Sequence, residues 1–246
     1  MSEIVARLRE AIGAIEERPR ASAAALGFGI ADLDMRLADR GLRIDALHEV
    51  APTGGDWGDD APASLFLAGI AARNSGPILW VRRHDLFAPA LYQAGLAPDR
   101  LIHAEARDDA ESLAVMEDAL RHRGLGAVIA EVKKAGLAAT RRLQLAAEGG
   151  RTMALLLRRP TRLGEDPLAS PSAAMTRWRI ASAASAPLPV AGLGRARWQV
   201  MLVRQRGGEP FELILEACDE KGRCALAAQL VDRPDFARRA DTRTAA

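Results

Sequence analysis

Several features that mark other protein classes are missing from this chain. No apolar run reaches the roughly 18 residues that a membrane-spanning helix needs. The amino terminus, MSEIVARLRE, is charged and amphipathic, and it has no apolar segment of the kind that a secretory signal peptide carries. These absences predict a cytoplasmic protein without membrane partners.

Cysteine is also scarce. The chain has two cysteines, Cys218 and Cys224, on either side of the turn-like residues 219–223, and this spacing places the thiols near each other across a hairpin. Two cysteines make neither a disulfide framework nor a complete zinc site. In a cytosolic protein we expect reduced thiols at packing positions, with a redox pair or a metal site as the alternatives.

The chain has no strong excess of charge of either sign. Lys and Arg number 34 against 32 Asp and Glu, and the formal net charge of +2 is too small to indicate a nucleic-acid-binding protein by itself. Hydrophobic residues make up 49% of the 246 residues, which supplies enough apolar surface for one large globular domain with a terminal extension.

Helical and strand patterns alternate through most of the chain. An amphipathic helix is expected over residues 3–17, and the alternation begins with a short helix at 30–38. Strands are then expected at 44–50, 78–81, 101–104, 127–131 and 152–157, and helices at 64–73, 89–94, 109–121 and 137–148. Such alternation predicts an α/β fold with a mainly parallel sheet covered on both faces.

After Arg158 the pattern changes. A loop rich in Pro, Ser and charge covers residues 160–176, and four strand-like runs follow without helices between them, at 177–183, 198–204, 211–216 and 225–231. We expect these runs to extend the sheet in antiparallel fashion. The domain prediction is an amphipathic helix and connector over 1–22, a core over 23–236 and a basic tail over 237–246.

The segment that follows the first expected strand, residues 51–62, lies where an α/β NTPase carries its phosphate-binding loop. That loop needs a Lys to neutralise the phosphates and a hydroxyl to bind Mg²⁺. No Lys or Arg occurs between Arg43 and Arg73, and the segment carries Asp56, Asp59 and Asp60 instead. Each like-charge pair at 4 Å costs about 1 kcal/mol in water and more when desolvated, so we expect no nucleotide binding unless a distant segment or another subunit supplies a cation.

No catalytic, cofactor-binding or metal-binding residues are predicted. Glu131 ends the third core strand at a position where NTPases place a metal-linked acid, but without a phosphate-binding loop a metal there has nothing to bridge, and a structural or vestigial role is expected. The four histidines show no ligand spacing, and no nucleophile–base pair stands out.

Five stretches resemble the RecA family or its ImuA branch. Residues 26–34 (LGFGIADLD) and 41–50 (GLRIDALHEV) resemble the entry into the RecA core, and residues 78–89, 94–102 and 174–180 resemble ImuA proteins. The resemblance covers about residues 20 to 235. It implies a RecA-like core of the P-loop NTPase type, with a degenerate phosphate loop.

The resemblance also implies a function. RecA proteins place a catalytic Glu just after the second strand, where this chain has Arg83-His84-Asp85, and this departure agrees with the missing Lys. ImuA proteins are implicated in the SOS response to DNA damage, in translesion synthesis and mutagenesis, with RecA and the polymerase-like ImuB as partners. The expected function is therefore a non-catalytic adaptor, a pseudo-ATPase without cofactors. A RecA-like ATPase and a single-stranded-DNA-binding repair factor are the alternatives.

A partner or DNA surface is predicted around the loop at 160–176. Its candidate residues are Trp57, Arg158, Arg159, Arg162, Arg177 and Arg179. The arginines flank the loop or alternate with apolar residues on the next strand, so one strand face is expected to be basic. Trp57 is a candidate anchor because Trp is enriched at binding hot spots, with packing over the vacant groove as the alternative. A solvated Arg-rich face is the alternative for the arginines, and the sequence does not indicate the oligomeric state.

Overall fold

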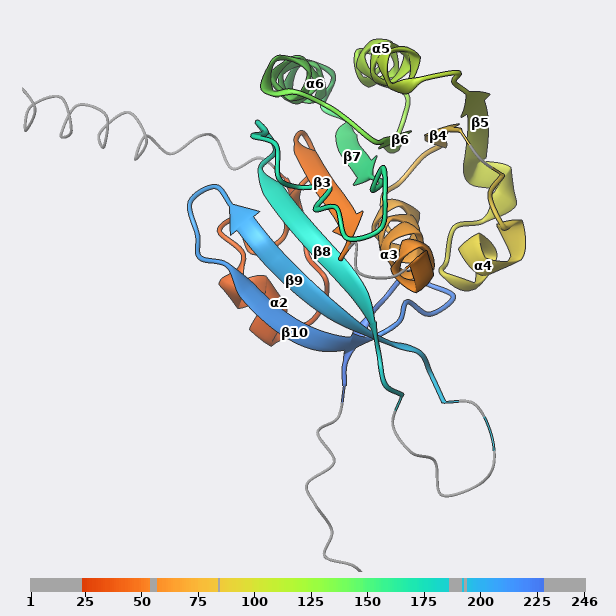
Figure 1. Cartoon of the computed structure of the whole chain (residues 1–246), viewed down its shortest axis with the longest axis vertical. Helices are drawn as coiled ribbons and strands as arrows, with labels where there is room; N and C mark the ends of the chain where they lie inside the picture. The colour runs from red at the N-terminus through yellow and green to blue at the C-terminus, as the bar shows by residue number, and fades with distance from the viewer. Residues whose placement is uncertain (1–23, 54–56, 84, 186–191, 193, 228–246) are drawn as a thin grey trace, which may run out of the picture.

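The computed structural model describes residues 24–53, 57–83, 85–185, 192 and 194–227 (Figure 1). The strands are β1 (Ala25–Leu26), β2 (Leu42–Arg43), β3 (Leu47–Pro52), β4 (Ile78–Arg82), β5 (Leu101–Glu105), β6 (Ala127–Val132), β7 (Met153–Arg158), β8 (Thr176–Ala183), β9 (Arg197–Gln205), β10 (Phe211–Glu216) and β11 (Ala225–Leu226). The α-helices are α2 (Ala31–Arg36), α3 (Asp60–Ala72), α4 (Ala88–Gln93), α5 (Asp109–Leu120) and α6 (Leu137–Gly150), and short 3₁₀ turns occur at η1 (Trp57–Asp59) and η2 (Pro98–Arg100).

Nine of the described strands form one sheet in the order β11-β10-β9-β8-β3-β7-β6-β4-β5. Every pair from β8 to β5 is parallel, and the pairs from β8 to β11 are antiparallel. The prediction of a mainly parallel sheet with antiparallel C-terminal strands is confirmed. One detail is wrong: the run at 177–183, expected to pair only in antiparallel fashion, is β8, which lies parallel to β3 on one side and antiparallel to β9 on the other.

Helices cover both faces of the parallel part of the sheet, as expected (Figure 1). On one face α3 and α4 pack over a core that includes Phe66, Leu155 and Trp178. On the other face α5 and α6 pack over a second core that includes Met116 and Leu156. Because successive strand residues point to opposite faces, Leu155 and Leu156 belong to different cores.

The buried helix after the first core strand agrees with its composition. In α3, Phe66, Leu67 and Ile70 are buried, as the apolar run predicts. The helix begins at Asp60, four residues earlier than expected, so Asp60 and Ser64 both stand in its first turns. This position brings α3 to the carboxyl ends of the parallel strands.

Near the described amino terminus lies a small sheet that the sequence pattern did not reveal. β1 and β2 pair as a two-stranded antiparallel unit, and the carboxylate of Asp34 accepts hydrogen bonds from the backbone N–H groups of Phe28 and Gly29. The helix expected at 3–17 and the tail at 237–246 lie outside the described residues, so the predicted domain boundaries stay predictions. None of the described helices is both long and apolar enough to cross a membrane.

Candidate functional site

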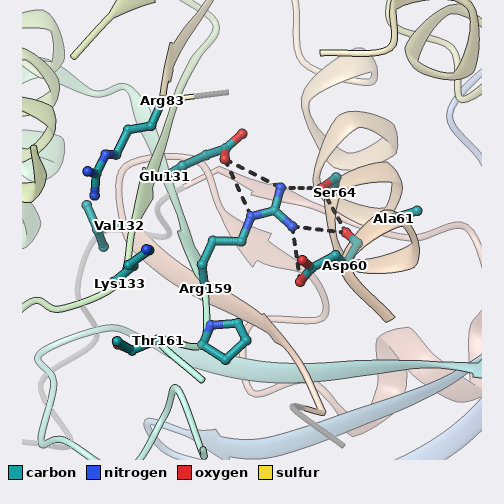
Figure 2. Close-up of a pocket in the computed structure, with 10 residues that line it drawn as sticks. Asp60, Ala61, Ser64, Arg83, Glu131, Val132, Lys133, Arg159 and Thr161 are labelled. Atoms are coloured by element: carbon teal, nitrogen blue, oxygen red, sulfur yellow. Dashed lines mark hydrogen bonds and ion pairs between the residues drawn. The ribbon is translucent and has the colours of Figure 1, made fainter. Parts of the chain in front are cut away.

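A pocket of about 410 Å³ opens at the carboxyl ends of β4, β6 and β7, beside the first turns of α3 (Figure 2). Ligands of open α/β sheets bind at this edge, because loops and helix N-termini converge there. The residues that line it are Asp60, Ala61, Ser64, Arg83, Glu131, Val132, Lys133, Arg159, Pro160 and Thr161. Residues 51–62, the expected counterpart of a phosphate-binding loop, end at this pocket, since Asp60 and Ala61 line it.

The guanidinium of Arg159 lies at the centre of this pocket, against the first turns of α3 (Figure 2). Its Nη1 lies 3.2 Å from Asp60 Oδ1 and donates to the Asp60 carbonyl at 3.3 Å. Its Nη2 donates to Ser64 Oγ at 3.0 Å, and both Nε and Nη2 lie 3.4 Å from Glu131 Oε2. The side chain is 20% exposed. One partly buried cation is therefore shared by two carboxylates and a hydroxyl.

Glu131 is held from both sides. Its second oxygen, Oε1, accepts a hydrogen bond from the indole N–H of the fully buried Trp80 at 3.0 Å, and its side chain is 2% exposed. The carboxylate therefore has a fixed orientation and both of its oxygens are engaged. This agrees with the structural role expected for it.

Two acids at the start of α3, Asp59 and Asp60, have partners that the local sequence does not show. Asp59 is buried, and its carboxylate accepts hydrogen bonds from the Thr53 hydroxyl and from the Ser182 N–H, the latter at 2.8 Å, which ties the segment to β8. Asp60 pairs with Arg159. The segment has no local cation, as its sequence shows, and the alternative of a cation from a distant segment applies to Asp60, because a residue 99 positions away supplies one.

The opposite wall of the pocket carries two more cationic side chains, those of Arg83 and Lys133. Arg83 pairs with Asp109 at 3.1 Å and donates to the Arg107 carbonyl at 3.2 Å. Asp109 in turn accepts the backbone N–H groups of Lys133 and Lys134. Arg83 stands just after β4, where the RecA resemblance implies a catalytic Glu, and its engagement with Asp109 gives it a structural task.

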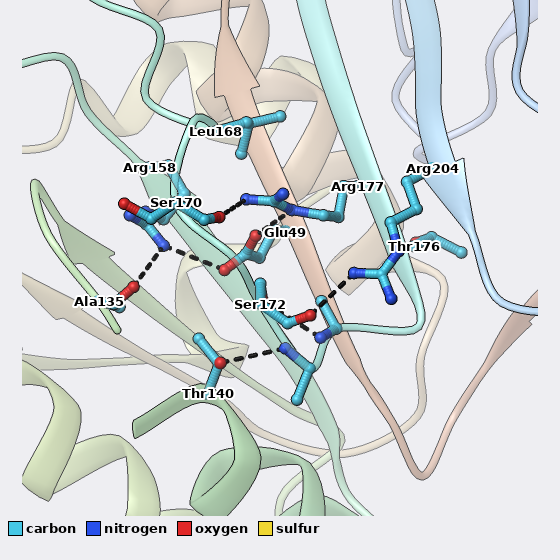
Figure 3. A network of polar contacts seen from close by, with 12 residues as sticks. Glu49, Ala135, Thr140, Arg158, Leu168, Ser170, Ser172, Thr176, Arg177 and Arg204 are labelled. Atoms are coloured by element: carbon cyan, nitrogen blue, oxygen red, sulfur yellow. Dashed lines mark hydrogen bonds and ion pairs between the residues drawn. The ribbon is translucent and has the colours of Figure 1, made fainter. Parts of the chain in front are cut away.

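A second ionic cluster lies on the other face of the sheet (Figure 3). Glu49 on β3 is completely buried, and its two oxygens lie 3.1 Å from Arg158 Nη1 and 2.6 Å from Arg177 Nε. Arg158 also donates to the Ala135 carbonyl at 3.3 Å, and Arg177 donates to the Ser170 carbonyl at 3.0 Å. The prediction that Arg158 and Arg177 belong to an exposed basic surface is wrong, since both are buried and shared by one carboxylate.

The loop at 160–176 is attached to the sheet by similar contacts. Arg179 is partly exposed and pairs with Asp166 at 2.5 Å, and Arg204 donates to the Ser172 carbonyl at 2.8 Å. Arg162 is exposed and makes no ion pair with a described residue. Of the arginines proposed for a partner or DNA surface, Arg162 alone is both exposed and unpaired within the part of the chain described.

Comparison with known proteins gives a clear relative. No protein-family model matches the chain. Two relatives named Protein ImuA, from Caulobacter vibrioides strains NA1000 / CB15N and ATCC 19089 / CIP 103742 / CB 15, are each 43% identical over 213 residues, which covers 82% of this chain and 87% of each relative. The chain belongs to the ImuA family.

The solved structures do not extend this assignment. The crystal structure of SulA from Pseudomonas aeruginosa matches 45% of this ImuA-family chain and 95% of its own chain, at 26% identity and a TM-score of 0.38. A TM-score of that size does not identify the fold. The family resemblance seen in the sequence is confirmed by the ImuA relatives.

The remaining predicted residues of the ImuA-family chain are placed as follows. Trp57 begins η1, and its side chain lies outside what the structure describes. His48 is buried between Thr176 Oγ1 at 2.7 Å and the Arg43 carbonyl at 2.9 Å, and burial lowers its pKa to about 4. His103 and His122 are exposed, and His84 lies outside the described residues. No group of three or more His, Cys, Asp or Glu side chains among the described residues is arranged to hold a metal ion.

Two important residues were missed from the sequence. Glu49 was placed in the expected strand at 44–50 without a role of its own, and the central position of Arg159 in the pocket was not foreseen. A signal for Glu49 does exist, because a carboxylate inside a strand that is buried on both faces must have a buried cationic partner. Nothing in the sequence says which arginine that partner is.

Proposed function

We propose that this ImuA-family protein is a non-catalytic adaptor in damage-induced translesion synthesis and mutagenesis, built on a RecA-like core whose nucleotide site is degenerate. Family membership supports the mutagenesis role. The strand, loop and buried helix at the carboxyl edge of a mainly parallel sheet support the RecA-like core. The partners that we propose are RecA and the polymerase-like ImuB protein.

The observation that carries the proposal is the position of Arg159. A triphosphate at the first turn of α3 would have to displace its guanidinium from Asp60, Ser64 and Glu131. Displacement would leave two carboxylates facing the phosphates, without the Lys that normally neutralises them. The pocket is therefore stabilised internally, and ATP hydrolysis is not expected.

The machinery for hydrolysis is also poorly matched. Glu131 is buried and engaged with Trp80 and Arg159, so it is not available to orient a metal-bound water. Arg83 stands where a base that activates water would be needed, and a guanidinium cannot accept a proton at physiological pH. The same scaffold remains suited to presenting loops to other proteins.

A binding experiment with purified components tests the adaptor role. The full chain is immobilised and challenged with RecA and with an ImuB-type protein, separately and together, without nucleotide. The proposal expects capture of both partners at levels that ATP does not change. Failure to capture either partner, or capture that requires ATP, would contradict it.

Trp57 provides a variant for the same assay. We expect Trp57→Ala to weaken capture of one partner at least tenfold, which is the size of a hot-spot loss. The matched control is Tyr92→Ala, which removes an aromatic side chain that is 62% exposed on α4, away from the pocket. Equal effects of the two substitutions would remove Trp57 from the proposed surface.

One observation favours a second candidate function, single-stranded DNA binding. Arg162 is exposed in the loop beside the pocket, and Arg204 and Arg206 are exposed on and just after β9. Anisotropy of a labelled oligonucleotide, measured over a salt series, tests this candidate. Binding whose salt slope falls by about one on Arg162→Ala would support it, and no binding at low salt would end it.

A further inference from the structure

The two cysteines are brought together by residues 217–224, termed here the cysteine turn, which connect β10 to β11. Cys218 Sγ and Cys224 Sγ lie 3.3 Å apart and share a hydrogen bond. Cys224 is buried and Cys218 is partly buried. A disulfide needs the sulfurs at about 2.05 Å, so a small side-chain movement joins them.

The backbone of the cysteine turn is held in place by its own hydrogen bonds. The Asp219 carboxylate accepts the N–H groups of Lys221 and Arg223, both at 2.9 Å, and the Asp219 N–H donates to the Arg223 carbonyl at 3.0 Å. Arg195 bridges the two ends of the turn by donating to the carbonyls of Ala217 and Arg223. The sulfurs are therefore placed near each other before any reaction takes place.

Glycines allow the cysteine turn to pack closely against the helical layer. A Cβ at Gly69 in α3 would lie 2.2 Å from Cys218 Sγ, and a Cβ at Gly95 would lie 2.3 Å from the Gly222 nitrogen. Gly222 itself has a positive φ of 71° and approaches the Gly69 carbonyl. The turn thus joins the antiparallel extension of the sheet to α3, the helix that carries Asp60 and Ser64.

The charges around the pair favour one thiolate. Arg73 and Arg195 both attract negative charge at the sulfurs. Either sulfur is able to donate the hydrogen bond between them. The thiol that loses its proton first is therefore the nucleophile, and the other is the resolving thiol.

We propose that Cys218 and Cys224 form a reversible intramolecular disulfide when the protein meets hydrogen peroxide, an oxidant small enough to reach a mostly buried pair. One thiolate of the pair attacks one peroxide oxygen, the O–O bond breaks, hydroxide leaves and a sulfenic acid forms on that cysteine. The sulfur of the other cysteine then attacks the sulfenic sulfur, the S–O bond breaks, and the departing hydroxide takes that thiol's proton as water. Two thiols lose two electrons, and one peroxide becomes two waters.

The disulfide covalently closes the cysteine turn, which lies beside α3. This proposal does not depend on the proposed adaptor function. Closing this short loop constrains the unfolded chain, so the oxidised protein unfolds at a temperature a few degrees higher than the reduced protein. A dithiol reductant reverses the change.

Intact-mass measurement of the full chain tests the proposal. The reduced protein is treated with hydrogen peroxide, denatured and alkylated, and the expected product is a single chain that has lost two hydrogens, takes up no alkyl group and regains two alkylatable thiols after dithiothreitol. Three results would overturn the proposal. The first is alkylation of both thiols after an exposure to peroxide that fully oxidises a free-thiol control. The others are a covalent dimer and a sulfinic acid product. Because the chain has two cysteines, this readout needs no variant.

Single substitutions test the two-step reaction. In Cys218→Ser and in Cys224→Ser the remaining thiol is expected to form a sulfenic acid that dimedone traps, because the resolving thiol is missing. In the wild-type chain trapping is expected to be at least several-fold weaker, because the disulfide forms first. Equal trapping in the wild type and in both variants would contradict the intramolecular disulfide.

Discussion

Arg158 and Arg159 are neighbours in the sequence and have opposite surroundings in the fold. Arg158 points to the α6 side of the sheet, where its side chain is 2% exposed and meets the fully buried Glu49. Arg159 points to the α3 side, where it is 20% exposed and is shared by Asp60 and Glu131 at the centre of the pocket. The alternation of a strand is sufficient to send one cation to a buried ion pair and the next to a solvent-lined site.

The two clusters differ in whether water is able to solvate a charge that has lost its ion-pair partner. In the Glu49 cluster a lost partner leaves a charge in an apolar interior, with little access of solvent to compensate. In the Arg159 cluster the pocket admits water, which solvates whatever remains. The two clusters are therefore expected to respond to mutation with different magnitudes.

The largest effect is expected for Glu49→Gln. This variant leaves Arg158 and Arg177 without their shared carboxylate, at a cost of about 3–5 kcal/mol in the free energy of unfolding. Urea unfolding measures it, with Glu105→Gln as the control, since Glu105 is 78% exposed and its pair with Arg82 is worth less than about 1 kcal/mol. Equal stability of the two variants would contradict the distinction between buried and exposed pairs.

Protonation of His48, the neighbour of Glu49 on the opposite face of β3, is expected to come next in size. Its folded-state pKa is about 4 against an ordinary value of 6.5, because burial disfavours the charged ring. The unfolded chain thus binds this proton more readily, so stability is fully present above pH 6.5 and is lost as the pH falls toward 4, by about 3 kcal/mol in total.

Unfolding free energies measured from pH 7 to pH 4 check this expectation. The difference between the wild type and His48→Gln isolates the contribution of the imidazole from that of the carboxylates. We expect the wild type to lose more stability than the variant over this range. Parallel pH curves would show that His48 does not titrate as its burial requires.

A smaller effect is expected for Arg159→Met, which keeps an unbranched, flexible side chain and removes the guanidinium. Glu131 and Asp60 lose a charged donor, at a cost of about 2 kcal/mol, since Glu131 keeps its bond to Trp80 and Asp60 is partly solvated. Urea unfolding compares it with Arg159→Lys, which retains the charge and should recover part of the loss. A loss in the free energy of unfolding as large as that of Glu49→Gln would contradict the expected difference between the two clusters.

The smallest effect is expected for Arg162→Ala. Arg162 is exposed and unpaired among the described residues, so its replacement should change the free energy of unfolding by less than about 0.5 kcal/mol. The same denaturant titration checks it against Arg158→Ala, which leaves Glu49 with one cation fewer and should be several-fold more costly. A large loss at Arg162 would reveal a structural contact that the account lacks.

The order and type of the elements could be predicted from the sequence, since hydrophobic periodicity depends on local spacing. Strand 127–131 and helix 137–148 are examples that the structure places within two residues of the expected bounds. The direction of β8 could not be predicted in this way, because its parallel neighbour β3 lies more than 120 residues earlier. Which strands pair is decided by tertiary packing.

The site shows the same limit more sharply. The missing Lys of the phosphate loop was visible in a single segment, and the degenerate site could be proposed from it. The compensating Arg159 was not recognised, because its partners Asp60 and Glu131 lie 99 and 28 residues away. Arg158 and Arg177 were assigned to a surface for a related reason: an arginine count says nothing about a buried carboxylate such as Glu49.

Calorimetric titration of the full chain with Mg²⁺-ATP tests the central claim. The claim is that the ion-pair cluster of Arg159, Asp60 and Glu131 occupies the pocket and prevents a nucleotide's phosphates from binding there. The account predicts no saturable heat at millimolar ATP, for the wild type and for Arg159→Met alike. One-site binding by the wild type, lost in Arg159→Met, would show instead that Arg159 is a phosphate ligand and that the pocket is a working nucleotide site.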